Sequence, residues 1–369
     1  MVPRNACLVL FYRLSDNNMA ASRILSFDLL KAFAIFLVVW GHVIQYFLST
    51  DPQSEPVYRF IYAFHMPLFM MVSGYFSGTS LDRPVLPMLR KRFMQLIVPC
   101  VAWGVVLYVT QLEAIDPQRA IDYSLTSLLH CLTHWFWFLK SLFCCFVLLA
   151  LGKWLRGGWA AWGLLLLLSQ FLPFLQLRYL LVPFLAGVWL SRSGAGERHP
   201  ARWCGGSALV FVVLFMSQPN EAVNVPSLTD SFKGGDYAMA LELFGWRLHR
   251  IFTGLAGSMC CISFFRWANF RSGWLSEAFA GYGRQTLGLY VLQVLLVEIV
   301  MAPYFNMDGA SFVVFNFVLA PGCSLLILGL LIDVVRLLAS HAFTAKYLLG
   351  VTARKLEPST SSSTSSSIR

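Results

Sequence analysis

Long uninterrupted apolar segments are the feature that most constrains how this chain can fold. A helix needs about 20 mostly apolar residues to cross the roughly 30 Å hydrocarbon core of a bilayer. Hydrophobic residues make up 57% of the 369 residues and charged residues only 12%, whereas a soluble domain carries about 25% charged residues. We therefore predict an all-α polytopic membrane protein with about ten transmembrane helices, at residues 25–48, 57–77, 93–110, 135–151, 158–175, 177–191, 205–217, 247–265, 285–305 and 312–335.

The predicted helices form one domain, with a segment of different character at each end. We expect a cytoplasmic extension over residues 1–22, in which Met19 is a possible alternative start of translation. The transmembrane domain is expected over residues 23–351, and its last stretch, 342–351, is short enough to lie at the interface. Residues 352–369 are dominated by Ser and Thr, so a disordered tail is predicted there.

The net charge of +10 would suit a nucleic-acid binder, but its distribution along the chain favours a different partner. With the N-terminus inside, the cytoplasmic segments hold 20 of the 28 Lys and Arg residues and the external segments hold 6. This asymmetry follows the positive-inside rule and predicts that both termini are cytoplasmic. The cations form no continuous patch, so we expect membrane lipid and no nucleic acid as a partner, in the cell inner (plasma) membrane.

The first predicted span carries ionisable residues, which are costly inside a membrane and therefore functional candidates. Lys31 and His42 are eleven positions apart, which places them about 20° apart on one helix face and about 16 Å apart along the axis. Asp28 lies one turn before Lys31 and is expected to pair with it. It is about 21 Å from His42, which is too far to orient that ring directly.

A second histidine and a glutamate are predicted at the depth of His42. His65 lies about 12 Å below the outer end of the second span, and His42 about 9 Å below the outer end of the first. Glu298, roughly 20 Å above the inner start of the ninth span, falls in the same layer. A histidine with an acidic or imidazole neighbour can act as a general base near neutral pH. We expect His42, His65 and Glu298 to form a catalytic group in which His65 or Glu298 orients His42.

Further cations are candidates for binding a phosphorylated substrate. Arg90, Lys91 and Arg92 lie at the cytoplasmic start of the third span, where charge and free backbone N–H groups suit a phosphate. From charge alone, ordinary positive-inside anchoring is the simpler interpretation of the same cluster. Lys140 lies within the fourth span and needs a partner there, so it joins Asp28 and Lys31 as a candidate for the substrate path. We see no metal-ligand spacing and expect no metal.

Together these motifs resemble acyltransferase family 3. The resemblance covers residues 22 to 340 and rests first on the Lys31-x10-His42 spacing preceded by Asp28. It also rests on the segments Phe64–Phe69, Arg90–Arg92, Trp137–Phe143, Arg178–Phe184 and Gly283–Tyr290. Two positions depart from the pattern of the family. Gln95 stands where many members have the second cation of a basic pair, and Gln293 stands where many have a histidine.

The resemblance implies a ten-helix bacterial membrane enzyme that moves an acyl group, usually acetyl from acetyl-CoA, to a hydroxyl of a surface polysaccharide or lipid-linked sugar. It implies that His42 is the essential histidine, with Lys31 as its partner in the motif, and that Arg90–Arg92 lies near the entry of acyl-CoA. Acetyl-CoA is then the donor substrate and a glycan the acceptor. His42 could act as a general base or form an acetyl-histidine intermediate, and the sequence leaves this choice, the acceptor and the oligomeric state open.

A transporter or flippase of a glycan or small molecule is the alternative hypothesis. In that case Asp28, Lys31 and His42 would form a proton or substrate relay through the membrane. We find no duplicated halves of the kind that many transporters have, and the basic cluster is placed for a phosphorylated donor. Both observations favour the enzyme.

Overall fold

The computed structural model describes residues 4–78, 82, 84–113, 125–155, 158–171, 174–195, 198–217 and 237–351. Within these ranges the chain is helical and contains no β-strand, as predicted. The predicted tail, 352–369, lies outside the described residues. The longer helices are α1 (Arg4–Phe47), α2 (Pro56–Tyr75), α3 (Val85–Glu113), α5 (Trp137–Leu155), α6 (Gly158–Phe171), α7 (Leu177–Ser193), α8 (Pro200–Met216), α10 (Tyr237–Trp267) and α14 (Ala320–Ser340). The shorter elements are η1 (Pro52–Ser54), α4 (Leu125–His134), η3 (Phe174–Gln176), α11 (Trp274–Arg284), α12 (Thr286–Gln293), η5 (Val294–Met301), α13 (Phe312–Val314), η6 (Phe315–Leu319) and α15 (Ala342–Tyr347).

Each of the ten predicted spans coincides with one or more of these helices. Five helical stretches are long and apolar enough to cross a membrane, namely Leu25–Phe47, Val85–Val109, Trp137–Leu155, Tyr237–Trp267 and Phe312–Ser340. The pair Trp274–Arg284 and Thr286–Met301, which is bent by 64°, adds a sixth if it is one span. Helices α2, α6, α7 and α8 are shorter or less apolar. Membrane-spanning helices are therefore present, and the count of ten crossings stays a prediction.

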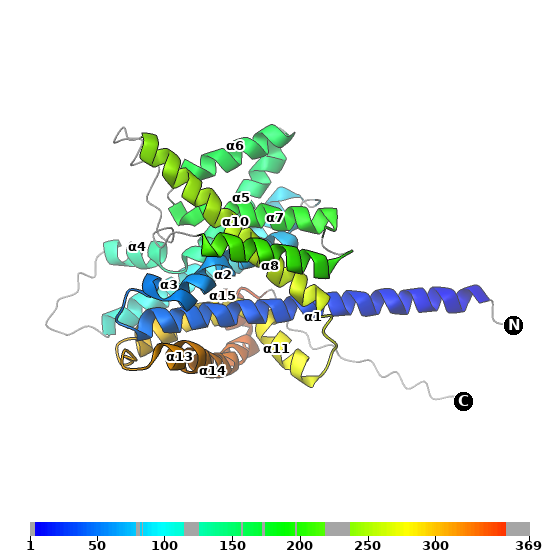
Figure 1. Cartoon of the computed structure of the whole chain (residues 1–369). Helices are drawn as coiled ribbons and strands as arrows, with labels where there is room; N and C mark the ends of the chain where they lie inside the picture. The colour runs from blue at the N-terminus through cyan, green and yellow to red at the C-terminus, as the bar shows by residue number, and fades with distance from the viewer. Residues whose placement is uncertain are drawn as a thin grey trace, which may run out of the picture.

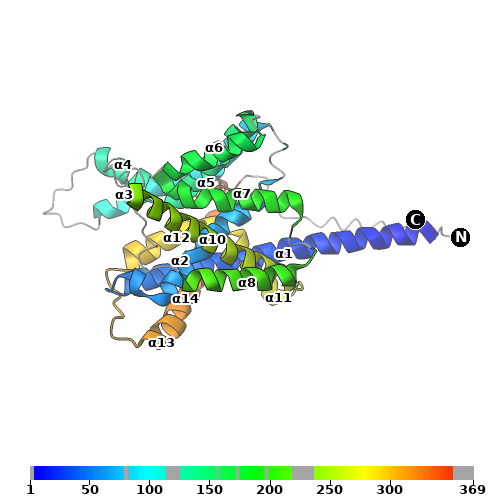
Figure 2. The same ribbon diagram turned by 45° about the horizontal axis from the view of Figure 1, so that its top comes forward.

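Helix α1 organises the bundle. It packs against α2, α10, α11, α12 and α14, while its N-terminal part projects beyond the other helices (Figures 1 and 2). From Arg4 onward, the predicted extension 1–22 is thus continuous with the first helix. The apolar side chains of Ile35, Val39 and Val43, spaced four residues apart, are completely buried. They lie along one row of α1 and pack into the hydrophobic core, so α1 is surrounded by other helices along this length.

Close helix contacts depend on glycine at the junction of α2 and α7. A Cβ atom on Gly74 would lie 1.9 Å from the Phe184 carbonyl oxygen, and one on Gly187 would lie 2.0 Å from the Met71 carbonyl oxygen. Only a residue without a side chain lets the two backbones approach this closely. These two contacts fix the position of α7, which begins at Leu177, along the axis of α2.

Two short π-helices interrupt the C-terminal helices. Segment η5 continues α12, and segment η6 continues α13 into α14. A π-helix widens the turn by one residue, is rare, and occurs often at functional sites. Each of these two segments carries a polar residue in an otherwise apolar sequence, Glu298 in η5 and Asn316 in η6. The π turns therefore change the direction in which these two polar side chains leave the helix.

Candidate active site

The side chains of His42 and Glu298 meet between α1 and η5. The His42 Nδ1 atom lies 3.1 Å from Glu298 Oε1, and both side chains are largely buried, with 18% and 8% of their surfaces exposed. Within the described part of the chain, Nδ1 has no hydrogen-bond partner of good geometry, so this is an ion-pair contact at an unfavourable angle. Catalytic contacts are commonly poorly aligned before substrate binds and tighten afterwards. The prediction that Glu298 lies in the layer of His42 is confirmed.

Tyr46 completes this group, and the sequence analysis missed it. Its hydroxyl donates a 2.8 Å hydrogen bond to Glu298 Oε2, so each carboxylate oxygen has one neighbour from α1. Its ring is parallel to the His42 ring, with centroids 5.9 Å apart and planes 4° apart. The available signal was helical spacing, because Tyr46 lies four residues after His42 and therefore on the same face.

His65 lies near this group but has a different partner. Its Nδ1 atom is 2.9 Å from the Ile61 carbonyl oxygen one turn earlier in α2, and its ring packs edge-on against Tyr62 with centroids 4.5 Å apart. The Tyr62 hydroxyl donates to Gln45 Oε1 at 2.9 Å, which connects α2 to α1 beside Tyr46. His65 also lies within electrostatic range of His42. Of the two candidates for orienting His42, Glu298 is the one in contact.

The cytoplasmic half of α1 carries a separate ionic group. Lys31 Nζ lies 2.5 Å from Asp28 Oδ1, which confirms the predicted pair, and Arg284 Nη1 lies 3.7 Å from Asp28 Oδ2. Arg284 reaches this position because α11 packs tightly on α1. A Cβ atom on Gly283 would lie 1.7 Å from the Asp28 carbonyl oxygen. The contacts of Asp28, Lys31 and Arg284 therefore depend on the glycine at position 283. Lys31 is separated from His42 by roughly three helical turns.

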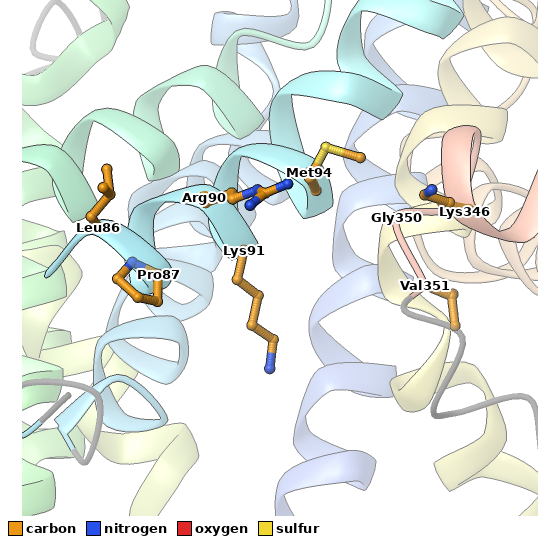
Figure 3. A pocket seen from close by; sticks show the side chains of 8 residues that line it. All are labelled: Leu86, Pro87, Arg90, Lys91, Met94, Lys346, Gly350 and Val351. Atoms are coloured by element: carbon orange, nitrogen blue, oxygen red, sulfur yellow. The ribbon is translucent and has the colours of Figure 1, made fainter. Parts of the chain in front are cut away.

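Arg90 and Lys91 line a groove at the N-terminal end of α3. The groove has a volume of about 550 Å³ and is bordered by Leu86, Pro87, Arg90, Lys91, Met94, Lys346, Gly350 and Val351. Figure 3 shows the two cations of α3 on one side and the C-terminal residues, with Lys346, on the other. Three cations thus surround a largely apolar groove, and Lys346 is a member that the sequence analysis did not identify.

The third predicted cation of this cluster, Arg92, points elsewhere. Its guanidinium lies over the Phe146 ring at 4.4 Å and donates to Gln95 Oε1 at 3.2 Å. The far wall of the groove is held to α3 by a hydrogen bond of 2.9 Å from Trp103 Nε1 to the Leu348 carbonyl oxygen. The groove is therefore a fixed feature between α3 and the segment after α14, and Arg92 contributes to packing beside it.

Lys140 lies at the end of another helix. Its amino group donates to the carbonyl oxygens of Leu132 at 3.0 Å and Thr133 at 2.5 Å, which belong to the last turn of α4. These carbonyl groups have no partner within their own helix, and a cation there is favourable. The structure thus gives Lys140 a capping contact, and the described residues that it contacts do not include the Lys31 group or the groove.

Among the described residues, no cluster of three or more His, Cys, Asp or Glu side chains could hold a metal ion.

Comparisons with known proteins indicate the family of this chain. Residues 24–332 match the family described as "Acyltransferase domain". Two similar proteins are the nodulation protein NolL of Mesorhizobium japonicum, 33% identical over 132 residues, and that of Sinorhizobium fredii, 32% identical over 133 residues. Each alignment covers 35% of this chain and 35% or 36% of the relative, so the chain spans about a third of each of these proteins. No solved structure matches. Because the family match covers most of the chain, including His42, Glu298, Arg90 and Lys91, the protein belongs to acyltransferase family 3.

Proposed function

We propose that this protein transfers an acetyl group from acetyl-CoA to a hydroxyl of a cell-surface or lipid-linked glycan, in the plasma membrane. The observation that carries the proposal is the contact of His42 with Glu298, which is itself held by Tyr46. A carboxylate beside Nδ1 favours the tautomer with its proton on that atom, which leaves Nε2 free to accept a proton. This is the arrangement that a general base for hydroxyl activation requires.

The reaction follows from these positions. His42 Nε2 removes the proton of an acceptor hydroxyl as its oxygen attacks the acetyl carbonyl, and Glu298 stabilises the imidazolium that forms. When the tetrahedral intermediate collapses, the carbon–sulfur bond breaks and the imidazolium returns the proton to the sulfur of CoA. A covalent acetyl-histidine intermediate remains the alternative for the same residue.

The donor is expected to bind from the cytoplasmic side. Arg90, Lys91 and Lys346 would hold the phosphate groups of CoA, because several cations around an apolar groove suit a ligand with charged and apolar parts. The pantetheine arm would pass the Asp28–Lys31–Arg284 group toward His42. Lys31 and His42 lie on one face of α1 and about 16 Å apart, a distance that an extended arm can cover.

The test measures transfer of labelled acetyl from acetyl-CoA to glycan in membranes that contain equal amounts of each variant. We expect His42→Ala to abolish transfer and His199→Ala, at an exposed position before α8, to leave it unchanged. Transfer at the wild-type rate by His42→Ala would contradict the proposal. Transport of glycan into vesicles without acetyl transfer would instead support the transporter hypothesis.

A further inference from the structure

One amide side chain of α1 is held beside His42 by a contact from α2. Gln45 lies three residues after His42, so the two side chains leave the helix about 60° apart and one turn from each other. The Tyr62 hydroxyl donates a hydrogen bond to Gln45 Oε1 at 2.9 Å. This bond fixes the amide group through its oxygen and leaves its nitrogen for another partner.

The Tyr62 ring that makes this contact is itself held on three sides. A Cβ atom on Gly41 would lie 2.7 Å from the Tyr62 ring, so a glycine at this position of α1 is what lets the ring approach Gln45. On its other sides, Tyr62 stacks on Tyr58 with ring centroids 3.8 Å apart and meets the His65 ring edge-on at 4.5 Å. A group that is oriented by such a fixed neighbour is suited to contact a substrate. The predicted site residue His65 thus has a role in supporting Tyr62.

The Gln45 amide nitrogen has no hydrogen-bond partner within the described part of the chain. Gln45 is only partly buried, and its nitrogen, unlike that of Gln293, retains accessible surface. His42 and Tyr46 on the same part of α1 are likewise incompletely buried, and 18% of the His42 side-chain surface is exposed. A molecule that contacts His42 can therefore also accept a hydrogen bond from Gln45.

Position and charge both favour the acceptor as this molecule. Along α1, Lys31 precedes His42 by eleven residues and Gln45 follows it by three, so they lie on opposite sides of His42. The donor is proposed to approach past Lys31, which leaves the side of Gln45 for the acceptor. An uncharged amide also suits a neutral hydroxyl or ether oxygen, whereas a phosphate is bound better by cations.

We propose that the Gln45 amide binds the acceptor by donating a hydrogen bond to the oxygen next to the hydroxyl that His42 deprotonates. Neighbouring carbon atoms of a sugar each carry an oxygen, so one oxygen attacks the acetyl carbonyl while the next is held by Gln45. The acceptor is then a sugar with a second oxygen beside the reacting hydroxyl. This inference rests on the proposed function and adds to it a residue that selects the acceptor.

The test uses the full chain in detergent, with labelled acetyl-CoA and with glycan extracted from the same cells as the varied acceptor. Gln45→Leu should raise the KM for glycan by about three- to tenfold, the value of one neutral hydrogen bond. The KM for acetyl-CoA should not change. Gln53→Leu is the matched control, because Gln53 lies on η1 and its side chain forms no hydrogen bond within the described residues.

Release of free acetate is a second measurement, which separates binding of the acceptor from damage to the base. In this reaction water attacks the acetyl carbonyl, the carbon–sulfur bond breaks, and the proton passes through His42 to the sulfur of CoA. Water needs no contact with Gln45, so Gln45→Leu should release acetate at the wild-type rate. The pH dependence of the remaining transfer, which reports the base, should also be unchanged.

Tyr62→Phe keeps the amide in place and removes only the bond that orients it. It should raise the KM for glycan by about two- to threefold, and it provides the comparison if Gln45→Leu does not fold. The inference is overturned if the folded variants keep the wild-type KM for glycan, or if acetate release falls in parallel with transfer. Transfer at the wild-type rate by His42→Ala would instead refute the proposed function, whatever the Gln45 variants do.

Discussion

Replacing Glu298 with glutamine is the most informative change at the catalytic group. Glutamine has nearly the same shape, and its oxygen can still accept the hydrogen bond from the Tyr46 hydroxyl that Glu298 accepts at 2.8 Å. Its amide nitrogen, however, can only donate a hydrogen bond to His42 Nδ1, whereas a carboxylate oxygen at that place can only accept one. His42 then carries its proton on Nε2, the atom that must accept the proton of the acceptor. The variant therefore keeps the packing and removes the base.

The expected magnitude follows from the distance between the two groups. At 3.1 Å and an effective dielectric constant of about 20, opposite unit charges interact by about 5 kcal/mol. This is an upper limit for the stabilisation of the imidazolium and corresponds to slightly less than four orders of magnitude in rate. Because the amide retains part of this interaction as a dipole, we expect kcat to fall by about 10²- to 10⁴-fold. The KM for acetyl-CoA should change little, since Glu298 is not in the groove.

The assay is the rate of labelled acetyl transfer from acetyl-CoA to glycan in membranes, over a range of acetyl-CoA concentrations. Asp333→Asn is the matched control, because Asp333 is an exposed carboxylate that pairs with Arg336 on α14 at 2.9 Å. It should retain the wild-type rate. A Glu298→Gln variant that is present in normal amounts and transfers acetyl within about threefold of the wild type would refute the argument, because about 0.6 kcal/mol is far below the interaction of a charge pair at this distance.

Three further changes test other parts of the site. Tyr46→Phe should lower kcat by about 10- to 150-fold, the value of one hydrogen bond to a charged group, with an unchanged KM in the same assay. Lys346→Gln should raise the KM for acetyl-CoA by about two- to fivefold with an unchanged kcat, because it removes one exposed charge from the groove. Gly283→Ala should destabilise the protein in detergent by about 1–3 kcal/mol, measured by thermal unfolding, since its Cβ would lie 1.7 Å from the Asp28 carbonyl oxygen. The control Gly281→Ala should be neutral, because its nearest neighbour is a side-chain end 4.0 Å away.

Helix geometry explains why much of the catalytic layer could be predicted. The rise of 1.5 Å per residue gives the depth of a side chain in a span without any knowledge of packing. From this rise, the sequence predicts that Glu298 lies at the depth of His42. It also predicts that Asp28 lies too far along α1 to contact His42. The pair of Asp28 with Lys31 followed in the same way, since residues three apart share a helix face. The depth of a side chain and its pairing within a helix depend on that helix alone, so both can be predicted from its sequence.

Contacts between helices could not be predicted in this way. Arg92 was grouped with Arg90 and Lys91, but neighbouring helical residues point about 100° apart, and only packing decides which of them faces Phe146. The sequence of α5 suggests a substrate path for Lys140, because it contains no information about the adjacent end of α4. Lys346 belongs to the groove only because the segment after α14 returns to α3. Each of these outcomes depends on how helices are rotated and placed around one another.

The π-helices show why rotation matters for this site. In an ideal α-helix, the direction of Glu298 relative to the buried residues of α12 is set by 100° per residue. Segment η5 departs from this value over eight residues, so the same sequence directs Glu298 toward His42 and Tyr46 by a different rotation. Segment η6 does the same for Asn316, whose amide nitrogen donates to Glu55 at 3.2 Å and joins this helix to the loop before α2. A π turn leaves backbone hydrogen bonds less regular, and so it is retained where a buried polar contact offsets that cost. Both π segments of the described chain meet this condition, which is a physical reason to expect that Glu298 is positioned for function and not merely tolerated.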